Sequence, residues 1–151
     1  MKRRKYLATV GTISVTSVAG CGGSGSTTET EEQEEESVED YVELVEHSFQ
    51  RPPVGSSGID LIFTVENVSD EELGRIEFDS ALFVDNERVD ESTATISGLG
   101  SGIQQEEDMI FNDVTLSELR EVTNYTITIR LTDRDRIEET YEFDEFNYPP
   151  E

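Results

Sequence analysis

Apolar and polar residues alternate along much of the chain beyond residue 58, and this period of two constrains the fold more than any other feature. The alternation is regular over residues 59–65, 76–84 and 125–131, and shorter stretches of it occur at 109–111 and 137–143. Successive side chains of a β-strand point to opposite faces of a sheet, so this pattern is typical of strands that bury one face. The sequence therefore predicts an all-β domain.

Two further elements are predicted from local signals. An opening strand is expected at residues 41–49, although residues 37–40 are also a suitable start for a short helical turn. Residues 116–120 are predicted to form one turn of helix, because Thr115 stands before them as a capping residue.

Turn-forming residues separate the predicted strands. Clusters of Gly, Pro, Asn, Asp and Ser occur at residues 52–58, 67–70, 85–87, 97–102 and 133–135. About seven strands, with turns roughly every 8 to 12 residues, are typical of an immunoglobulin-like antiparallel β-sandwich. A small open barrel is the main alternative. The Trp and the disulfide of antibody domains are missing, so the similarity is one of architecture.

The first twenty residues have the organisation of an export signal. A basic start at residues 2–5 precedes a mildly apolar run up to Val18, which is too short to span a bilayer permanently. The pair Arg3 and Arg4, followed closely by an aromatic residue and leucine, resembles the twin-arginine export signal. That resemblance implies a protein that folds before export. Residues 1–20 are therefore predicted to be a signal peptide.

The segment Val18-Ala19-Gly20-Cys21 resembles a lipobox, in which small residues precede a cysteine that becomes the lipid-modified N-terminus. The resemblance implies that membrane lipid is attached to Cys21, which would hold the mature protein on the outer face of the cytoplasmic membrane. A free cysteine in a soluble protein and a weak uncleaved anchor are the alternatives. Because Cys21 is the only cysteine, no internal disulfide is expected.

Residues 21–37 are predicted to be a disordered linker. They contain Gly, Ser and Thr followed by a block of glutamates. Such a segment buries too little apolar surface to offset the entropy of ordering, and its like charges keep it extended. The β-sandwich domain is expected to cover residues 38–148.

The charge of the chain limits its partners and indicates its habitat. From Cys21 onward the chain has seven Arg, no Lys and all 35 Asp and Glu, which gives a formal charge of −28. Nucleic acid is excluded as an expected partner, because its phosphates are bound through Lys and Arg. Repulsion between so many like charges would destabilise a folded domain in dilute buffer, but at 1 M salt it is screened within about 3 Å. The composition therefore indicates a halophilic protein. An ordinary acidic domain with an acidic tail is the alternative.

Three segments together resemble the FxLYD-like and related immunoglobulin-like domains of secreted prokaryotic lipoproteins. These segments are residues 63–69, which end in Asn-Val-Ser, residues 76–85, which end in Leu-Phe-Val-Asp, and residues 99–102. The chain has Asn86 where glycine is common after the turn aspartate. The resemblance implies an immunoglobulin-like accessory module and supplies no catalytic residues.

Few residues are candidates for chemistry. His47 is the only histidine and is expected to have a structural role on a strand face beside Tyr41, Val45 and Phe49. Carboxylate groups such as Asp133 with Asp135, or Glu106 to Asp108, are expected in so acidic a chain and are interpreted as a solvated face. We therefore expect no catalytic residues, no metal site, no cofactor and no enzyme activity.

Two sequons are candidate N-glycosylation sites, Asn67-Val68-Ser69 and Asn124-Tyr125-Thr126. Asn67 is the better candidate because it stands at a predicted strand end, and its alternative role is that of a turn asparagine. The aromatic and Pro-containing residues 143–151 are expected to pack across a sheet edge.

These observations predict a membrane-tethered, extracytoplasmic lipoprotein that acts as a non-catalytic binding or structural module at the cell surface. Its surface sheet, with exposed threonines and acidic residues, is the expected contact for an envelope protein or a ligand. One alternative is an accessory subunit of a membrane transporter or redox complex. Another is a divalent-cation-binding protein or a small hydrolase, which would require inward carboxylates lining a cleft.

Overall fold

The structure of the chain is a computed structural model that describes residues 4–5, 36–52, 57–134 and 137–148. Arg3, Cys21 and nearly all of the predicted linker lie outside the described residues. Arg4 belongs to the two-residue strand β1 (Arg4–Lys5), whose backbone pairs with β8 opposite Glu142 and Tyr141. No helix in the described ranges is long and apolar enough to cross a membrane.

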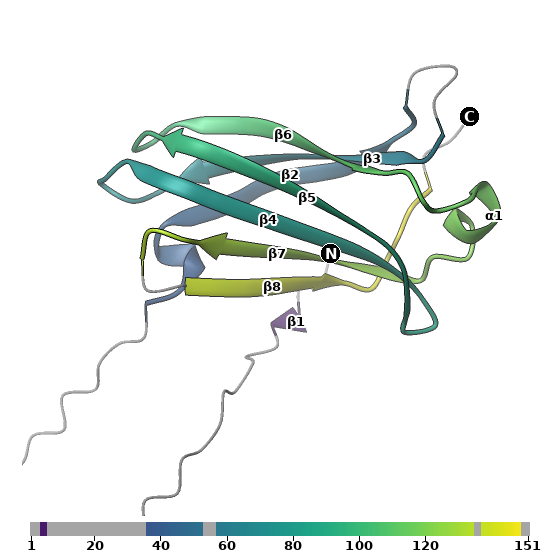
Figure 1. Ribbon diagram of the computed structural model, residues 1–151. Helices are drawn as coiled ribbons and strands as arrows, with labels where there is room; N and C mark the ends of the chain where they lie inside the picture. The colour runs from purple at the N-terminus through teal and green to yellow at the C-terminus, as the bar shows by residue number, and fades with distance from the viewer. Residues whose placement is uncertain (1–3, 6–35, 53–56, 135–136, 149–151) are drawn as a thin grey trace, which may run out of the picture.

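The described residues form an all-β sandwich of two antiparallel sheets (Figure 1). One sheet has the order β1-β8-β7-β4-β5 and the other has the order β2-β3-β6. The main strands are β2 (Val42–Gln50), β3 (Ile59–Asn67), β4 (Leu73–Val84), β5 (Glu87–Leu99), β6 (Gln104–Phe111), β7 (Asn124–Leu131) and β8 (Ile137–Phe143). The predicted immunoglobulin-like sandwich of about seven strands is confirmed, and the open barrel is not formed.

Both local helix predictions are confirmed. A 3-10 turn, η1 (Val38–Asp40), precedes β2, so the start of the domain contains the helical turn as well as the strand. The second turn, α1 (Leu116–Leu119), follows Thr115, whose hydroxyl accepts a hydrogen bond from the Glu118 backbone N–H at 3.3 Å. The Glu118 carboxylate in turn accepts from the Thr115 backbone N–H at 2.8 Å, which completes a capping box.

The strand β5 was not among the segments identified by alternation, and the turn expected at residues 97–102 was partly wrong. β5 continues to Leu99, and the chain turns only after that residue. β5 lies at the edge of its sheet, and most of its side chains are exposed and polar, so its sequence carries only a weak period of two.

The turn that joins β4 to β5 requires two residues that tolerate a positive φ. Asp85 and Asn86 form a two-residue hairpin turn, with φ angles of 49° and 71°. Both angles lie in the left-handed region that a type I′ turn requires, and Asn and Asp adopt it more readily than other non-Gly residues.

The core lies between the two sheets and is built from the alternate residues that the sequence pattern indicated. Phe63 on β3 and Phe78 on β4 are fully buried, and their ring centroids lie 4.8 Å apart across the sandwich. At the open side of the sandwich, Phe146 packs against Phe49 of β2 with centroids 4.7 Å apart, and Tyr148 lies under the Arg51 guanidinium. The chain beyond β8 therefore packs across to β2, as expected.

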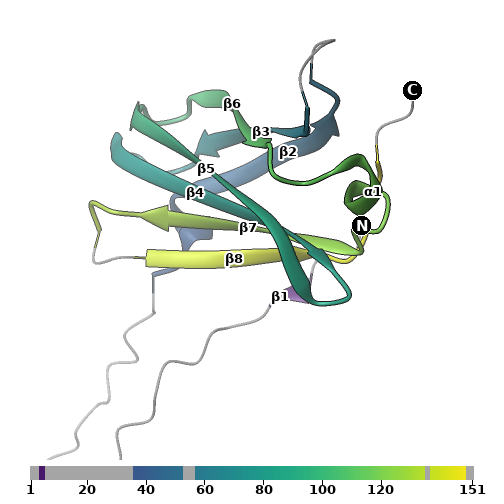
Figure 2. The same cartoon turned by 45° about the vertical axis from the view of Figure 1, so that its right-hand side comes forward.

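The connections gather at two ends of the sandwich (Figures 1 and 2). The β3–β4, β5–β6 and β7–β8 connections lie at the same end as η1, where the chain enters the domain. The β4–β5 turn and α1 lie at the opposite end. The outer faces of the two sheets lie between these ends.

Candidate functional site

The outer face of the β8-β7-β4-β5 sheet carries the best candidate site, and we call it the four-strand face. Strand register sets its side chains in rows. One row contains Thr140, Thr128, Asp79 and Thr93, and the next contains Glu142, Thr126, Ala81 and Glu91. Flanking rows contain Glu138, Arg130, Glu77 and Thr95 on one side, and Asn124, Phe83 and Arg88 on the other.

An open depression of about 580 Å³ lies on this face over β4, β5 and β7. It is lined by Asp79, Ser80, Ala81, Phe83, Arg88, Glu91, Ser92, Thr93, Thr126 and Thr128. Ala81 has the smallest side chain of the face, and its register neighbours are Thr126 on β7 and Glu91 on β5. Ala81 is therefore the floor, and longer polar side chains form the walls.

Two of the hydroxyl groups that line the depression are available for a ligand. The Thr128 and Thr140 hydroxyls lie 2.8 Å apart and hydrogen-bond to each other. The hydroxyls of Thr93 and Thr126 make no hydrogen bond to any other described residue. Each of these two hydroxyls has one donor and two acceptor sites to offer.

Charged side chains around the floor are held by ion pairs. Arg130 donates to Glu138 at 2.5 Å, and its Nη1 lies 3.3 Å from both Glu77 Oε2 and Asp79 Oδ2. The hydrogen bond to Glu138 raises the pKa of the Arg130 guanidinium above its usual value. On the other wall, Arg88 Nη1 donates to Glu91 Oε2 at 2.6 Å. The two carboxylates nearest the floor, Asp79 and Glu91, are therefore each oriented by an arginine.

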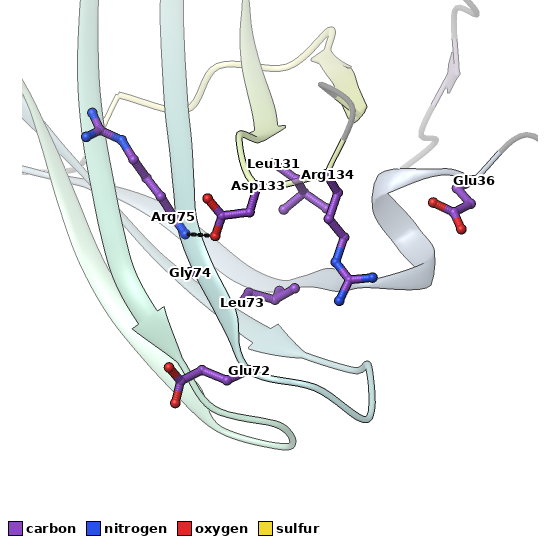
Figure 3. A pocket seen from close by; sticks show the side chains of 8 residues that line it. All are labelled: Glu36, Glu72, Leu73, Gly74, Arg75, Leu131, Asp133 and Arg134. Atoms are coloured by element: carbon purple, nitrogen blue, oxygen red, sulfur yellow. Dashed lines mark hydrogen bonds between the residues drawn. The ribbon is translucent and has the colours of Figure 1, made fainter.

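A second depression, of about 390 Å³, lies at the end of the sandwich where the domain begins (Figure 3). It is lined by Glu36, Glu72, Leu73, Gly74, Arg75, Leu131, Asp133 and Arg134. Figure 3 shows Asp133 accepting a hydrogen bond from the Arg75 backbone N–H, at 2.9 Å. Arg134 pairs with Glu71 and lies 4.7 Å from the centre of the Tyr41 ring. This depression is smaller than the one on the four-strand face, and we treat it as the weaker candidate.

Asn67, the better of the two predicted sequons, is fully buried at the end of β3. Its side-chain nitrogen donates to the carbonyl oxygens of Glu71 at 2.7 Å and Leu99 at 2.8 Å. Its side-chain oxygen accepts from the Ser69 backbone N–H at 3.0 Å and from the Ser69 hydroxyl at 2.7 Å. This geometry favours the alternative role of a turn asparagine, which joins the β3–β4 connection to the end of β5.

Asn124, the other predicted sequon, begins β7 and is partly exposed. Its side-chain oxygen accepts a hydrogen bond from the Thr123 hydroxyl at 2.8 Å. It lies beside Phe83 in the register of the four-strand face, near the rim of the depression.

His47 lies in an aromatic cluster between the two sheets. Its Nε2 is 2.7 Å from the Tyr125 hydroxyl, and its ring centroid is 4.4 Å from that of Phe143. Burial raises the pKa of Tyr125 to about 12. Phe49 contacts the same tyrosine, but Val45 is 40% exposed because a bulge between Leu44 and Glu46 shifts the strand. The expected neighbourhood was therefore wrong for Val45.

The carboxylate groups singled out in the sequence do not converge on a common point in the described ranges. Glu106 and Asp108 are exposed on β6, and Asp133 binds the Arg75 backbone, while Asp135 lies outside the described residues. Among the residues that the structure describes, no group of three or more His, Cys, Asp or Glu side chains is placed to hold a metal ion.

Comparisons with known proteins leave the chain without an assigned family. No family model matches it, and no curated protein matches it. One solved structure, of a Bacteroides fragilis protein named as a beta-galactosidase, is 11% identical over 69% of this chain, with a TM-score of 0.38. The matched region spans 16% of that protein, and a similarity of this size supports no argument about activity.

Proposed function

We propose that this protein is a membrane-tethered, extracytoplasmic lipoprotein that acts as a non-catalytic binding module and uses the four-strand face. The observation that carries the proposal is the open depression over β4, β5 and β7, which is lined by both polar and apolar side chains. Its volume falls within the range of about 300 to 1,000 Å³ that is usual for ligand sites. Its lining residues stand on paired strands, so the backbone positions of the binding groups are fixed by the sheet.

The tether is supported by the sequence of the first 21 residues. A basic start with Arg3 and Arg4, a short apolar run and the lipobox-like segment ending at Cys21 agree with each other. Removal of residues 1–20 would also remove β1 and leave β8 as an edge of its sheet. The four-strand face itself consists of residues that remain.

The tether is tested by cell fractionation and mass spectrometry. The native protein is expected in the membrane fraction, with a lipid mass on a peptide that begins at Cys21. Cys21→Ser is expected to release the protein into the medium. Retention of the Cys21→Ser protein in the membrane fraction would contradict the lipid anchor.

The binding face is tested by purifying the lipoprotein from membranes in molar salt and identifying what accompanies it. Ala81→Arg is expected to fill the floor of the depression and abolish co-purification of the companion, whether it is a protein or a glycan. Thr64→Arg is the matched control, because Thr64 faces outward on the three-stranded sheet and the charge change is the same. Equal recovery of the companion with both variants would reject the four-strand face as the binding surface.

A further inference from the structure

We infer that the four-strand face binds a neutral, hydroxyl-rich ligand, a glycan without charged groups, in the depression whose floor is Ala81. The inference rests on the proposed function, because it names the ligand class of the same face. It is carried by the lining of the depression, where hydroxyls, oriented carboxylates, a guanidinium and one aromatic ring surround a small side chain.

The hydrogen-bonding capacity of the depression matches a polyhydroxylated ligand. Thr93 and Thr126 contribute hydroxyls that are not bonded to other described residues. Asp79 uses Oδ2 for Arg130 and Glu91 uses Oε2 for Arg88, so within the described residues Asp79 Oδ1 and Glu91 Oε1 remain as acceptors. Sugar hydroxyls are both donors and acceptors, and a carboxylate accepts from them through charge-assisted bonds.

The rim supplies the remaining features of such a site. Arg88 binds Glu91 through one Nη1 bond in the described residues, so its other guanidinium N–H groups remain as donors at the depression. Phe83 lines the same depression and offers an apolar ring to the C–H face of a sugar. The site therefore presents polar groups and one apolar surface side by side.

The charges of the face argue against an ionic ligand. Asp79 and Glu91 are already paired with Arg130 and Arg88, so an incoming cation would compete with two arginines. An anion would meet a domain whose formal charge is strongly negative. In molar salt, moreover, attraction between charges is screened within about 3 Å, whereas hydrogen bonds made at contact persist.

The same lining argues against a protein partner at this spot. The buried centres of protein interfaces are enriched in aromatic residues and methionine and depleted of charged side chains. The depression instead has an alanine floor between hydroxyls and carboxylates, with Phe83 as its one aromatic residue. A protein anchor would leave several of these polar groups desolvated and unpaired.

The test uses the mature lipoprotein in detergent and molar potassium chloride, with three neutral hexaoses, of glucose, mannose and galactose, as probes. Binding is followed by chemical-shift changes of the backbone amides. We expect at least one hexaose to shift amides of β4, β5 and β7, with no shifts on β2 and β6. Ala81→Arg should abolish these shifts, and Thr64→Arg should leave them unchanged.

A second and milder variant is included so that the test does not depend on the correct folding of Ala81→Arg. Asp79→Asn keeps the shape of a partly exposed side chain but removes the charge of an acceptor, so affinity should fall about tenfold or more. Absence of shifts with all three hexaoses overturns the inference, and so does preferential binding of a sulfated hexaose. If Ala81→Arg still removes a co-purifying protein, the inference fails while the proposed binding face stands.

Discussion

At the scale of single residues, the fold depends on a few polar side chains whose bonds are internal. Asn67 is the main example, because its buried side chain bonds both to the β3–β4 connection and to the end of β5. Asp90 has a similar role, since its carboxylate accepts from the backbone N–H groups of Glu91, Asp113 and Val114. The sequence indicated a turn role for Asn67 but none for Asp90, and it did not indicate the distant partners, Leu99 for Asn67 and Val114 for Asp90.

Asn67→Ala is expected to lower the free energy of unfolding by about 2–4 kcal/mol. The substitution removes the donor from the carbonyl oxygen of Glu71 and from the carbonyl oxygen of Leu99, which lies in the buried part of the network. Denaturant unfolding in molar salt measures the effect. Asn124→Ala is the control and should cost less than about 1 kcal/mol, because Asn124 is partly exposed. Equal effects of the two substitutions would contradict the structural role of Asn67.

Of the two sequons, we expect only the partly exposed one, Asn124, to be available for glycosylation. A protein that folds before export presents Asn67 to the modifying enzyme with its amide already buried and bonded. Mass spectrometry of the native protein is therefore expected to find Asn67 unmodified. Any glycan should be found on Asn124, and a glycan on Asn67 would contradict this order or show that modification precedes folding.

The buried phenol of Tyr125 leads us to predict that the protein loses stability at high pH. Its pKa is raised from 10.0 to about 12 by burial, so between these values the unfolded chain loses the phenol proton while the folded protein retains it. Fewer protons on the unfolded state mean that the free energy of unfolding falls as pH rises through this range, by up to about 2 kcal/mol. Denaturant titrations across the range measure it.

Tyr125→Phe is the matched control for that pH dependence. The variant loses the hydrogen bond to His47, so it should be less stable at neutral pH. Its stability should decline less between pH 10 and 12 than that of the parent protein. An unchanged decline would assign the pH dependence to other groups.

At the scale of elements, the strands differ in how clearly their sequence pattern predicts them. β3 and β7 bury every second residue, and their alternation was sufficient to predict them. β5 buries only Asp90, Ile96 and Leu99 among its thirteen residues, because it is an edge strand with exposed sides. The four lining residues that β5 contributes to the candidate site, Arg88, Glu91, Ser92 and Thr93, were therefore missed.

The left-handed conformation of the β4–β5 turn is expected to limit which residues are tolerated at position 86. Asn86→Val places a β-branched residue at a φ of 71°, which should destabilise the fold by about 1–2 kcal/mol. Asn86→Gly should change the stability by less than about 0.5 kcal/mol, because glycine adopts this φ without strain. Thermal unfolding compares the two variants. A valine variant as stable as the glycine variant would show that the turn does not depend on the left-handed conformation.

At the scale of the whole molecule, the acidic charge is expected to make the stability of the sandwich depend on salt. The three-stranded sheet has Glu43, Glu46, Glu66, Glu106 and Asp108 at positions where its strands pair, and most of them are exposed. Repulsion among such groups extends about 10 Å at 0.1 M salt but only about 3 Å at 1 M. From the composition we therefore predict that the folded domain needs a high salt concentration to be stable.

Stability should rise steeply with potassium chloride. The unfolding temperature is expected to increase between 0.1 M and 1 M as self-repulsion is screened. A triple variant, Glu46→Gln, Glu66→Gln and Glu106→Gln, should reduce the dependence on salt, because it removes three of the charges on one face. An equal rise with sucrose at matched osmolality would assign the effect to solvent exclusion instead of screening.

The sequence by itself determined the period of two, most turn positions, the acidic charge and hence the sandwich, because these depend on local geometry and composition. It also determined which faces of β3 and β7 are buried. Only the tertiary structure decided which outward residues stand together. Asp79, Thr93 and Thr128 belong to three separated segments, and they become neighbours only when the register of β4, β5 and β7 is set. Register depends on the packing of the whole core, so neither this depression nor the burial of Asn67 is visible in any local segment of the chain.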